Sequence, residues 1–226
     1  MNYITATYFQ AAQNHSALLL QHYQYQNIPI CLLALSAGKD TSQGKAAAYL
    51  TGQLLQWFRS LPFKRIARNP DKHLSYLESS LQSLLQQACS DLISCGLISG
   101  DMSLSLSGIL CADDHFLLFH RGGQGIYLLN QSFNKSHLQC LTEHLAVPDS
   151  PQTLTLCQGI LQQDVVILFA TDTLCRQLTD QEIRECLYVR ELHGAKQAGR
   201  HLQELGRRGE ALGGRDMAAA VLLTCL

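Results

Sequence analysis

The chain has 226 residues, of which 46% are hydrophobic and 15% are charged, and its formal net charge is −1. This composition provides enough apolar side chains for a substantial core and excludes a disordered chain. The balanced charge gives no broad attraction to nucleic acid or to anionic lipid, so we expect no nucleic-acid partner.

The first half of the chain predicts strands followed by two long helices. Alternating or continuously apolar side chains predict three strands, over residues 3–9, 15–24 and 28–35. Apolar residues then recur at three- and four-residue steps, which predicts helices over residues 44–60 and 71–94. Between these helices lies a basic connector that contains Lys64, Arg65 and Arg68.

The second half predicts mainly strands, with one helical region over residues 180–209. The segments with strand character are 102–111, 115–120, 125–130, 153–161, 164–170 and 217–226. The glycines at 122–125 predict a tight hairpin between two of these strands, and the segments on either side of residues 162–163 predict another pair. Strands and helices do not alternate as βαβ units, so we expect an α+β fold with antiparallel sheets sandwiched between helices.

Several further features are missing from the sequence. No apolar run approaches the roughly 20 residues of a membrane-spanning helix, and the first residues do not have the pattern of a signal peptide. We therefore expect no membrane span and a cytoplasmic location. The nine cysteines form no C-x-x-C pair, which predicts reduced, mostly buried thiols. No repeat or flexible linker interrupts the pattern, which favours a single domain over residues 1–226.

Residues 164–183 have the most informative pattern in the chain. An apolar run of strand length ends at Asp172, and after a short linker Thr179 and Glu182 have the spacing of a capping box that opens a helix. A carboxylate where a buried strand meets a loop is a common position for a metal-binding or catalytic residue. Asp172 is therefore a candidate site residue.

This segment and three other short motifs, in the same order, resemble the metal-dependent protein serine/threonine phosphatases of type 2C, or PPM type. The resemblance extends over essentially the whole chain. It implies a four-layer α/β/β/α sandwich, in which two antiparallel sheets are flanked by helices. It also implies a site that holds two divalent cations and activates a water between them.

Most of the family's site residues are replaced in this chain. Gln10 stands where the family has the arginine that grips the phosphate, and His15 stands where it has a metal-binding Asp. Ser36 and Ala37 replace the bridging Asp and the Gly that follows it, and Gly123 replaces the carboxylate of the Gly-Asp-Ser-Arg segment. The resemblance therefore implies no intact catalytic residue. It also implies no phosphate-binding residue, because glutamine cannot form a charged bidentate grip.

Two of the family's carboxylates remain, Asp172 and Asp216. Mg²⁺ and Mn²⁺ prefer carboxylate oxygens, and two carboxylates without a bridging ligand hold one ion weakly at best. We expect no cofactor, with a single weak Mn²⁺ or Mg²⁺ site at this pair as the alternative. His15 with these two residues is a further candidate, as a transition-metal site. Both alternatives compete with a purely structural role for these side chains.

The sequence thus favours a pseudophosphatase, in which a phosphatase-like domain acts as a protein-binding or regulatory module. The resemblance implies a partner such as a Ser/Thr kinase, a phosphoprotein or a component of an assembly, and the short chain suggests a bacterial source. One alternative is an active Mn²⁺- or Mg²⁺-dependent phosphatase with a degraded site that also uses Asp40 or Asp101. The other is a structural subunit of a larger assembly.

Overall fold

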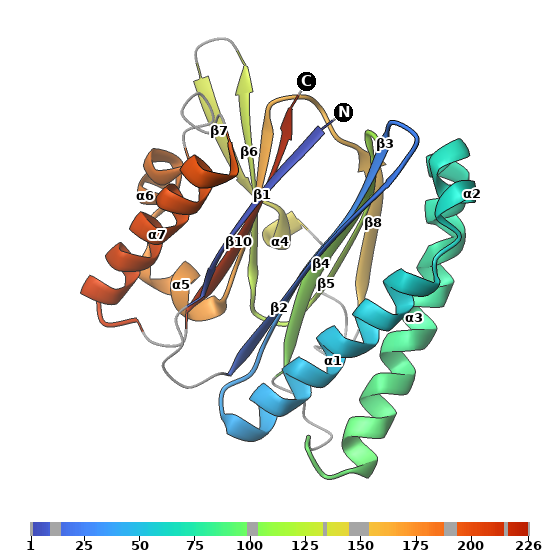
Figure 1. The fold of residues 1–226 in the computed structure, drawn as a ribbon. Helices are drawn as coiled ribbons and strands as arrows, with labels where there is room; N and C mark the ends of the chain where they lie inside the picture. The colour runs from blue at the N-terminus through green and yellow to red at the C-terminus, as the bar shows by residue number, and fades with distance from the viewer. Residues whose placement is uncertain are drawn as a thin grey trace. The chain divides into compact units, whose positions relative to one another are not determined.

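The structure is a computed structural model that describes residues 2–9, 15–98, 104–132, 135–144, 154–187, 194–214 and 217–225. The strands in these ranges form two five-stranded antiparallel sheets (Figure 1). The chain divides into two compact units, each built on one sheet. The β1 unit comprises Met1–Gln13, Gly123–Ala146 and Gln162–Leu226, and the β2 unit comprises Asn14–Gly122 and Val147–Leu161.

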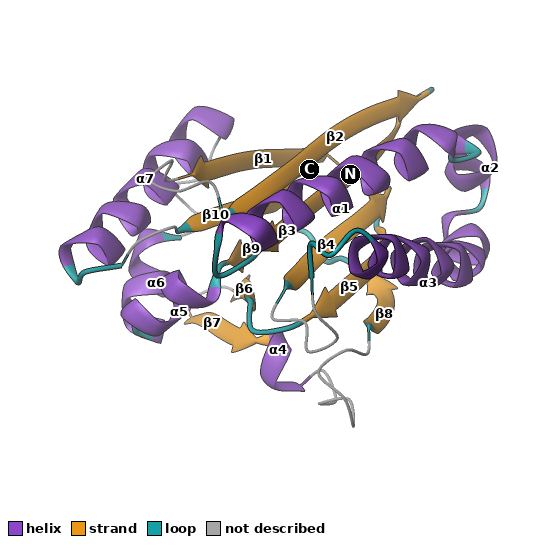
Figure 2. Ribbon diagram, turned by 90° about the horizontal axis from the view of Figure 1, so that it is seen from below, coloured by secondary structure: helices purple, strands orange, loops and turns teal. Residues whose placement is uncertain are grey.

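The β2 unit carries its helices on one face of its sheet (Figure 2). The strand order is β2-β3-β4-β5-β8. The strands are β2 (Ser16–Tyr25), β3 (Ile28–Ala37), β4 (Ser105–Ala112), β5 (His115–Arg121) and β8 (Thr155–Ile160). The helices are α1 (Thr41–Ser60), α2 (Phe63–Arg68) and α3 (Pro70–Ser94).

Local sequence signals explain where these helices begin. The Asp40 carboxylate accepts a hydrogen bond from the Gln43 backbone N–H at 2.8 Å and caps α1. Asn69 caps α3 in the same way, with Pro70 at the first helical position, where its missing N–H costs nothing. The leucine stripes of α1 and α3 pack on alternate residues of β3 and β4, such as Leu32 and Leu110, and this packing forms the core of the unit.

The β1 unit has the strand order β1-β10-β9-β6-β7. Its strands are β1 (Asn2–Phe9), β6 (Gly125–Ser132), β7 (Lys135–Cys140), β9 (Val165–Ala170) and β10 (Ala218–Cys225). Its helices are α4 (Leu141–His144), α5 (Asp172–Gln177), α6 (Asp180–Cys186) and α7 (Ala195–Ala211). Thr179 and Glu182 form the predicted capping box at the start of α6. The buried side of α7, including Leu202 and Leu205, packs with the sheet residues in one apolar core.

The α7 helix lies close to β1 because it presents a glycine to that strand. A Cβ at Gly206 would overlap the ring of Tyr8, whose Cε2 atom would be 2.6 Å away. The Tyr8 hydroxyl donates a hydrogen bond to Glu210 Oε1 at 2.7 Å. Burial and, to a smaller extent, this hydrogen bond raise the pKa of Tyr8 to about 12. Gly206 therefore creates the space in which the tyrosine ring is held.

The predicted fold is confirmed as two antiparallel sheets flanked by helices, but two strand pairings were wrong. The glycine-rich residues 122–125 do not form a hairpin, because β5 and β6 belong to different sheets. The strands β8 and β9, predicted as a pair, are also in different sheets. In both cases the strand after the connection pairs with distant strands: β6 with β7 and β9, and β9 with β6 and β10.

Several short elements also differ from the prediction. The basic connector contains helix α2, and the linker after β9 contains helix α5, each only six residues long. The predicted helical region 180–209 contains two helices, α6 and α7, and neither β7 nor α4 was predicted. Within the described ranges, no helix combines the length and the hydropathy that a membrane crossing requires.

Candidate functional site

Asp172 occupies the first turn of α5, directly after the buried strand β9 and the connecting residue Thr171. Thr171 is fixed to the adjacent strand by two hydrogen bonds. Its backbone N–H donates to the Ala218 carbonyl at 3.0 Å, and its hydroxyl oxygen accepts from the Ala218 N–H at 3.2 Å. The end of β9 is therefore rigidly attached to β10, and this attachment determines where the Asp172 carboxylate lies.

Both oxygens of the Asp172 carboxylate are engaged by one arginine. Arg176 Nε donates to Oδ1 at 2.9 Å, and Arg176 Nη2 lies 2.9 Å from Oδ2. The two residues are four positions apart on α5, which is the spacing for an ion pair on one helix face. Hydrogen bonding to the carboxylate raises the pKa of Arg176 above its ordinary value. The pair is exposed to solvent, and a metal ion at this carboxylate would compete with the guanidinium group for its negative charge.

Gly123 lies next to Asp172. A Cβ at position 123 would be 3.5 Å from Asp172 Cγ and 3.8 Å from its Oδ1, which is ordinary van der Waals contact. The structure thus brings together two positions that the sequence matched to family carboxylates. Only one of these two positions carries a carboxylate in this chain.

Gln124 follows in the same segment and was not predicted as a site residue. Its side chain is almost completely buried, with 2% of the residue exposed, and neither its Nε2 nor its Oε1 has a hydrogen-bond partner in the described structure. Buried amide groups are nearly always paired, so an unpaired one beside a candidate site is unusual. No local sequence signal identifies it, because its burial depends on the surrounding fold.

Three other predicted site residues lie in the β2 unit. Ser36 is fully buried, and its hydroxyl donates to the Ser105 carbonyl at 3.1 Å. The Ser105 hydroxyl donates to the Ala37 carbonyl at 3.1 Å. The Gly38 N–H donates to the His15 carbonyl at 2.8 Å, which ties the beginning of β2 to the end of β3. The side chain that the sequence matched to the family's bridging Asp therefore bonds within its own sheet.

The described donors do not match a centre for two metal ions. No group of three or more His, Cys, Asp or Glu side chains that could hold a metal ion occurs in the parts of the chain that the structure describes. Asp40 is committed to capping α1. The predicted residues Gln10 and Asp216, and the alternative ligand Asp101, lie outside the described residues. Their roles, and those of His15 and Asp172 as ligands, remain predictions.

A second buried polar pair in the β2 unit was missed from the sequence. Ser107 on β4 and His120 on β5 are direct partners in the register, and Ser107 Oγ lies 2.8 Å from His120 Nδ1. Burial lowers the pKa of His120 to about 4, against a smaller opposing effect of a backbone hydrogen bond with Gly122. His120 is therefore neutral at pH 7 and holds the Ser107 side chain. The alternating Ser and Leu residues of β4 place Ser107 on the strand, but only the register identifies its partner.

No protein-family model and no curated protein matches the chain. Solved structures match it over nearly its full length. PppA of Pseudomonas aeruginosa, described as a key regulatory component of T6SS, has a TM-score of 0.68 at 16% identity, over 99% of this chain and 98% of the other. The Mycobacterium tuberculosis serine/threonine phosphatase PstP/Ppp has a TM-score of 0.70 at 17% identity, over 99% of each chain.

Two further structures give the same result. The S. agalactiae serine/threonine phosphatase has a TM-score of 0.71 at 14% identity, over 99% of this chain and 100% of the other. The catalytic domain of PstP in complex with two manganese ions has a TM-score of 0.64 at 18% identity, over 98% of each chain. Identities this low show the fold alone. The chain therefore has the α+β fold of the PPM-type serine/threonine phosphatases.

Proposed function

We propose that this protein is a pseudophosphatase, with the phosphatase fold but without efficient metal-dependent hydrolysis, and that it acts by binding another protein. The observation that carries this proposal is the pairing of Asp172 with Arg176 beside Gly123. The guanidinium group of Arg176 contacts both oxygens of the Asp172 carboxylate. The neighbouring position 123 has no second carboxylate that would help a metal ion compete with that guanidinium group.

The chemistry of the metal supports the same conclusion. Hydrolysis by two divalent cations needs them about 4 Å apart with a bridging water, and hard cations need several anionic oxygens to hold them there. The Ser36 hydroxyl is neutral, and its hydrogen bond to Ser105 is made inside the sheet. A carboxylate paired with arginine and a neutral hydroxyl each supply less negative charge than a metal-bridging carboxylate, which supports the loss of an activated water.

Catalysis is tested by hydrolysis of p-nitrophenyl phosphate and of a phosphothreonine peptide, in Mn²⁺ and in EDTA. We expect no difference between the two conditions. The control is Asp172→Asn, which removes the charge of the carboxylate. Mn²⁺-dependent turnover that Asp172→Asn abolishes would overturn the proposal and establish an active phosphatase with a degraded site.

Metal binding is tested separately by thermal shift. A ligand at 100 times its dissociation constant stabilises the folded state by about 2.7 kcal/mol. We expect no such shift with Mn²⁺ for the natural chain. The double variant Gly123→Asp with Arg176→Gln supplies a second carboxylate and removes the guanidinium, so it should gain a shift. Arg176→Gln alone is the matched control, and a shift of the natural chain would contradict the proposed loss of metal.

The class of partner is part of the proposal. PppA is described as a regulatory component of T6SS, and another matching structure belongs to work on the bacterial stressosome, described as a modular system that controls secondary messenger signalling. These descriptions favour a role in a protein assembly, and a Ser/Thr kinase or a phosphoprotein is the other class of partner that we propose. A pull-down of the natural chain from its native cells tests this proposal. A constitutive complex favours the structural-subunit alternative, and a partner bound only under some growth conditions favours a regulatory role.

A further inference from the structure

A group of exposed cations surrounds helix α2 in the β2 unit. We call it the α2 basic surface, and it consists of Arg59, Lys64, Arg65, Arg68 and Lys72. These are five of the chain's 17 Lys and Arg residues, but only one of its 18 Asp and Glu residues lies between positions 59 and 72. The rest of the chain has 12 basic and 17 acidic residues, a net charge of −5. Residues 59–72 therefore carry a net positive charge in a chain that is otherwise net negative.

These cations are not neutralised by the protein itself. None of the five forms an ion pair with another described residue, whereas Arg176 pairs with Asp172 and Arg208 pairs with Glu185 and Glu204. Arg208 belongs to a second basic stretch of the sequence, Gly-Arg-Arg-Gly at residues 206–209. Arg208 is thus paired within the fold, whereas the cations around α2 are exposed to the solvent.

Helix stability explains only part of this cluster. Arg59 lies in the last turn of α1, and Arg65 and Arg68 lie in the last turn of α2, where a cation interacts favourably with the helix dipole. Lys72 lies in the first turn of the 25-residue helix α3, where the dipole disfavours a positive charge. Its placement adds charge to the surface and is not explained by the helix dipole.

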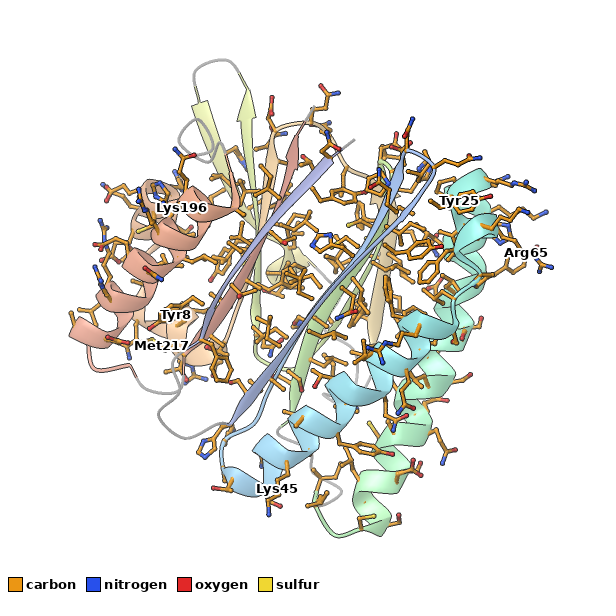
Figure 3. The ribbon with its side chains drawn as sticks, in the orientation of Figure 1. Tyr8, Tyr25, Lys45, Arg65, Lys196 and Met217 are labelled. Atoms are coloured by element: carbon orange, nitrogen blue, oxygen red, sulfur yellow. The ribbon has the colours of Figure 1, made fainter. Side chains whose placement is uncertain are left out.

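The α2 basic surface is held rigidly against the sheet. The Tyr23 ring of β2 stacks on Phe63 of α2 with centroids 4.0 Å apart and 17° between the ring planes, and Phe58 of α1 packs edge-on against Phe63 at 5.0 Å. Tyr23 remains 40% exposed, so it gives the basic surface an aromatic border. Figure 3 shows Arg65 extending from α2 into the solvent, with Tyr25 at the neighbouring end of β2.

We propose that the α2 basic surface docks a short acidic segment of a partner protein. This inference rests on the proposed function, because it names the surface through which the protein would bind. A short segment fits better than a nucleic acid, because one six-residue helix and its flanks carry the charge and the remaining net charge of −5 repels a long polyanion. The exposed Tyr23 ring suits an apolar or aromatic residue beside the acidic ones.

The test is fluorescence anisotropy with a short, fluorescein-labelled peptide rich in Glu and containing one Phe. The variant is Arg65→Glu with Arg68→Glu. The matched control is Lys196→Glu with Arg200→Glu on α7, which changes the net charge equally at two other exposed cations. We expect the dissociation constant to rise about tenfold in the α2 variant and to change little in the control, with weaker binding of the natural chain at high salt.

An equal loss of affinity in both variants would overturn the proposal, because the attraction would then depend on net charge alone. Tighter binding of single-stranded DNA or phosphatidylserine vesicles than of the peptide, lost in the α2 variant, would overturn it in favour of another partner class. Circular dichroism verifies that both variants fold. p-Nitrophenyl phosphate turnover is measured on the same samples: turnover refutes the proposed function, whereas absent turnover with absent peptide binding refutes only this surface.

Discussion

The packing of α7 on β1 yields a sharp prediction for Gly206→Ala. An added methyl group would overlap the Tyr8 ring, because Cε2 would be 2.6 Å away and ordinary carbon contacts begin near about 3.5 Å. The ring must therefore move by roughly 1 Å. That movement would break the hydrogen bond from the Tyr8 hydroxyl to Glu210.

The magnitude follows from two opposing terms. Alanine in place of glycine inside a helix stabilises it by about 1 kcal/mol. Overpacking of this kind costs about 1–3 kcal/mol, and the lost hydrogen bond costs about 1 kcal/mol more. We expect Gly206→Ala to lower the free energy of unfolding by about 1–3 kcal/mol, which for a chain of this size lowers Tm by roughly 2–12 °C.

Gly199→Ala is the matched control on the same helix. Nothing lies within 4 Å of the Cβ that this substitution adds, so it should raise the free energy of unfolding by up to about 1 kcal/mol. Urea denaturation measures both variants, and ultraviolet titration should show the pKa of Tyr8 falling from about 12 toward its ordinary value in Gly206→Ala alone. Equal stabilisation by both substitutions would refute the argument that Gly206 is required for close packing.

Three further predictions concern other buried or strained positions. Gln124→Met removes two unpaired buried polar atoms and should raise the free energy of unfolding by about 1–3 kcal/mol in urea denaturation, whereas the exposed control Gln163→Met should have little effect. A loss of stability would mean that the Gln124 amide is paired in solution. The pKa of His120 is lowered from 6.5 to about 4 in the folded state, so its contribution to the free energy of unfolding is complete above pH 6.5, and roughly 3 kcal/mol is lost as the pH falls to 4. His120→Gln should flatten the stability profile between pH 6.5 and 4, and an unchanged slope would contradict this prediction. Gln26 has a φ of 55° in the two-residue turn between β2 and β3, so Gln26→Gly should raise Tm with a gain of about 0.5–1 kcal/mol, and a lowered Tm would argue against this.

The long elements of the fold were predictable from the sequence, because their side-chain pattern is set by one dominant environment. The continuous apolar run of β3 and the leucine stripe of α3 are examples. The glycines at 122–125 were misread, because the same local flexibility serves a hairpin and a connection between sheets. The pairing of β6 with β9 decides between these two structures, because it places β6 in the sheet that does not contain β5.

The sequence predicted where the candidate site residues lie, but it did not predict the ion pair and hydrogen bonds that they form. The strand-end position of Asp172 follows from the local pattern, and so does the absence of a carboxylate at Gly123. The pairing with Arg176 was readable from the four-residue spacing but was not predicted. The hydrogen bond from Ser36 to the Ser105 carbonyl could not be predicted from the sequence, because it depends on the register that places the end of β3 beside the start of β4.

The strand β1 has one neighbour in the described sheet, β10, and the register joins Asn2 to Cys225 and Phe9 to Ala218. During synthesis, residues 2–9 leave the ribosome about two hundred residues before the strand that pairs with them. The pairing of β1 with β10 can therefore form only after β10 has been synthesised. Until then a nascent β1 depends on chaperones or on its own polar residues to avoid pairing with the wrong chain.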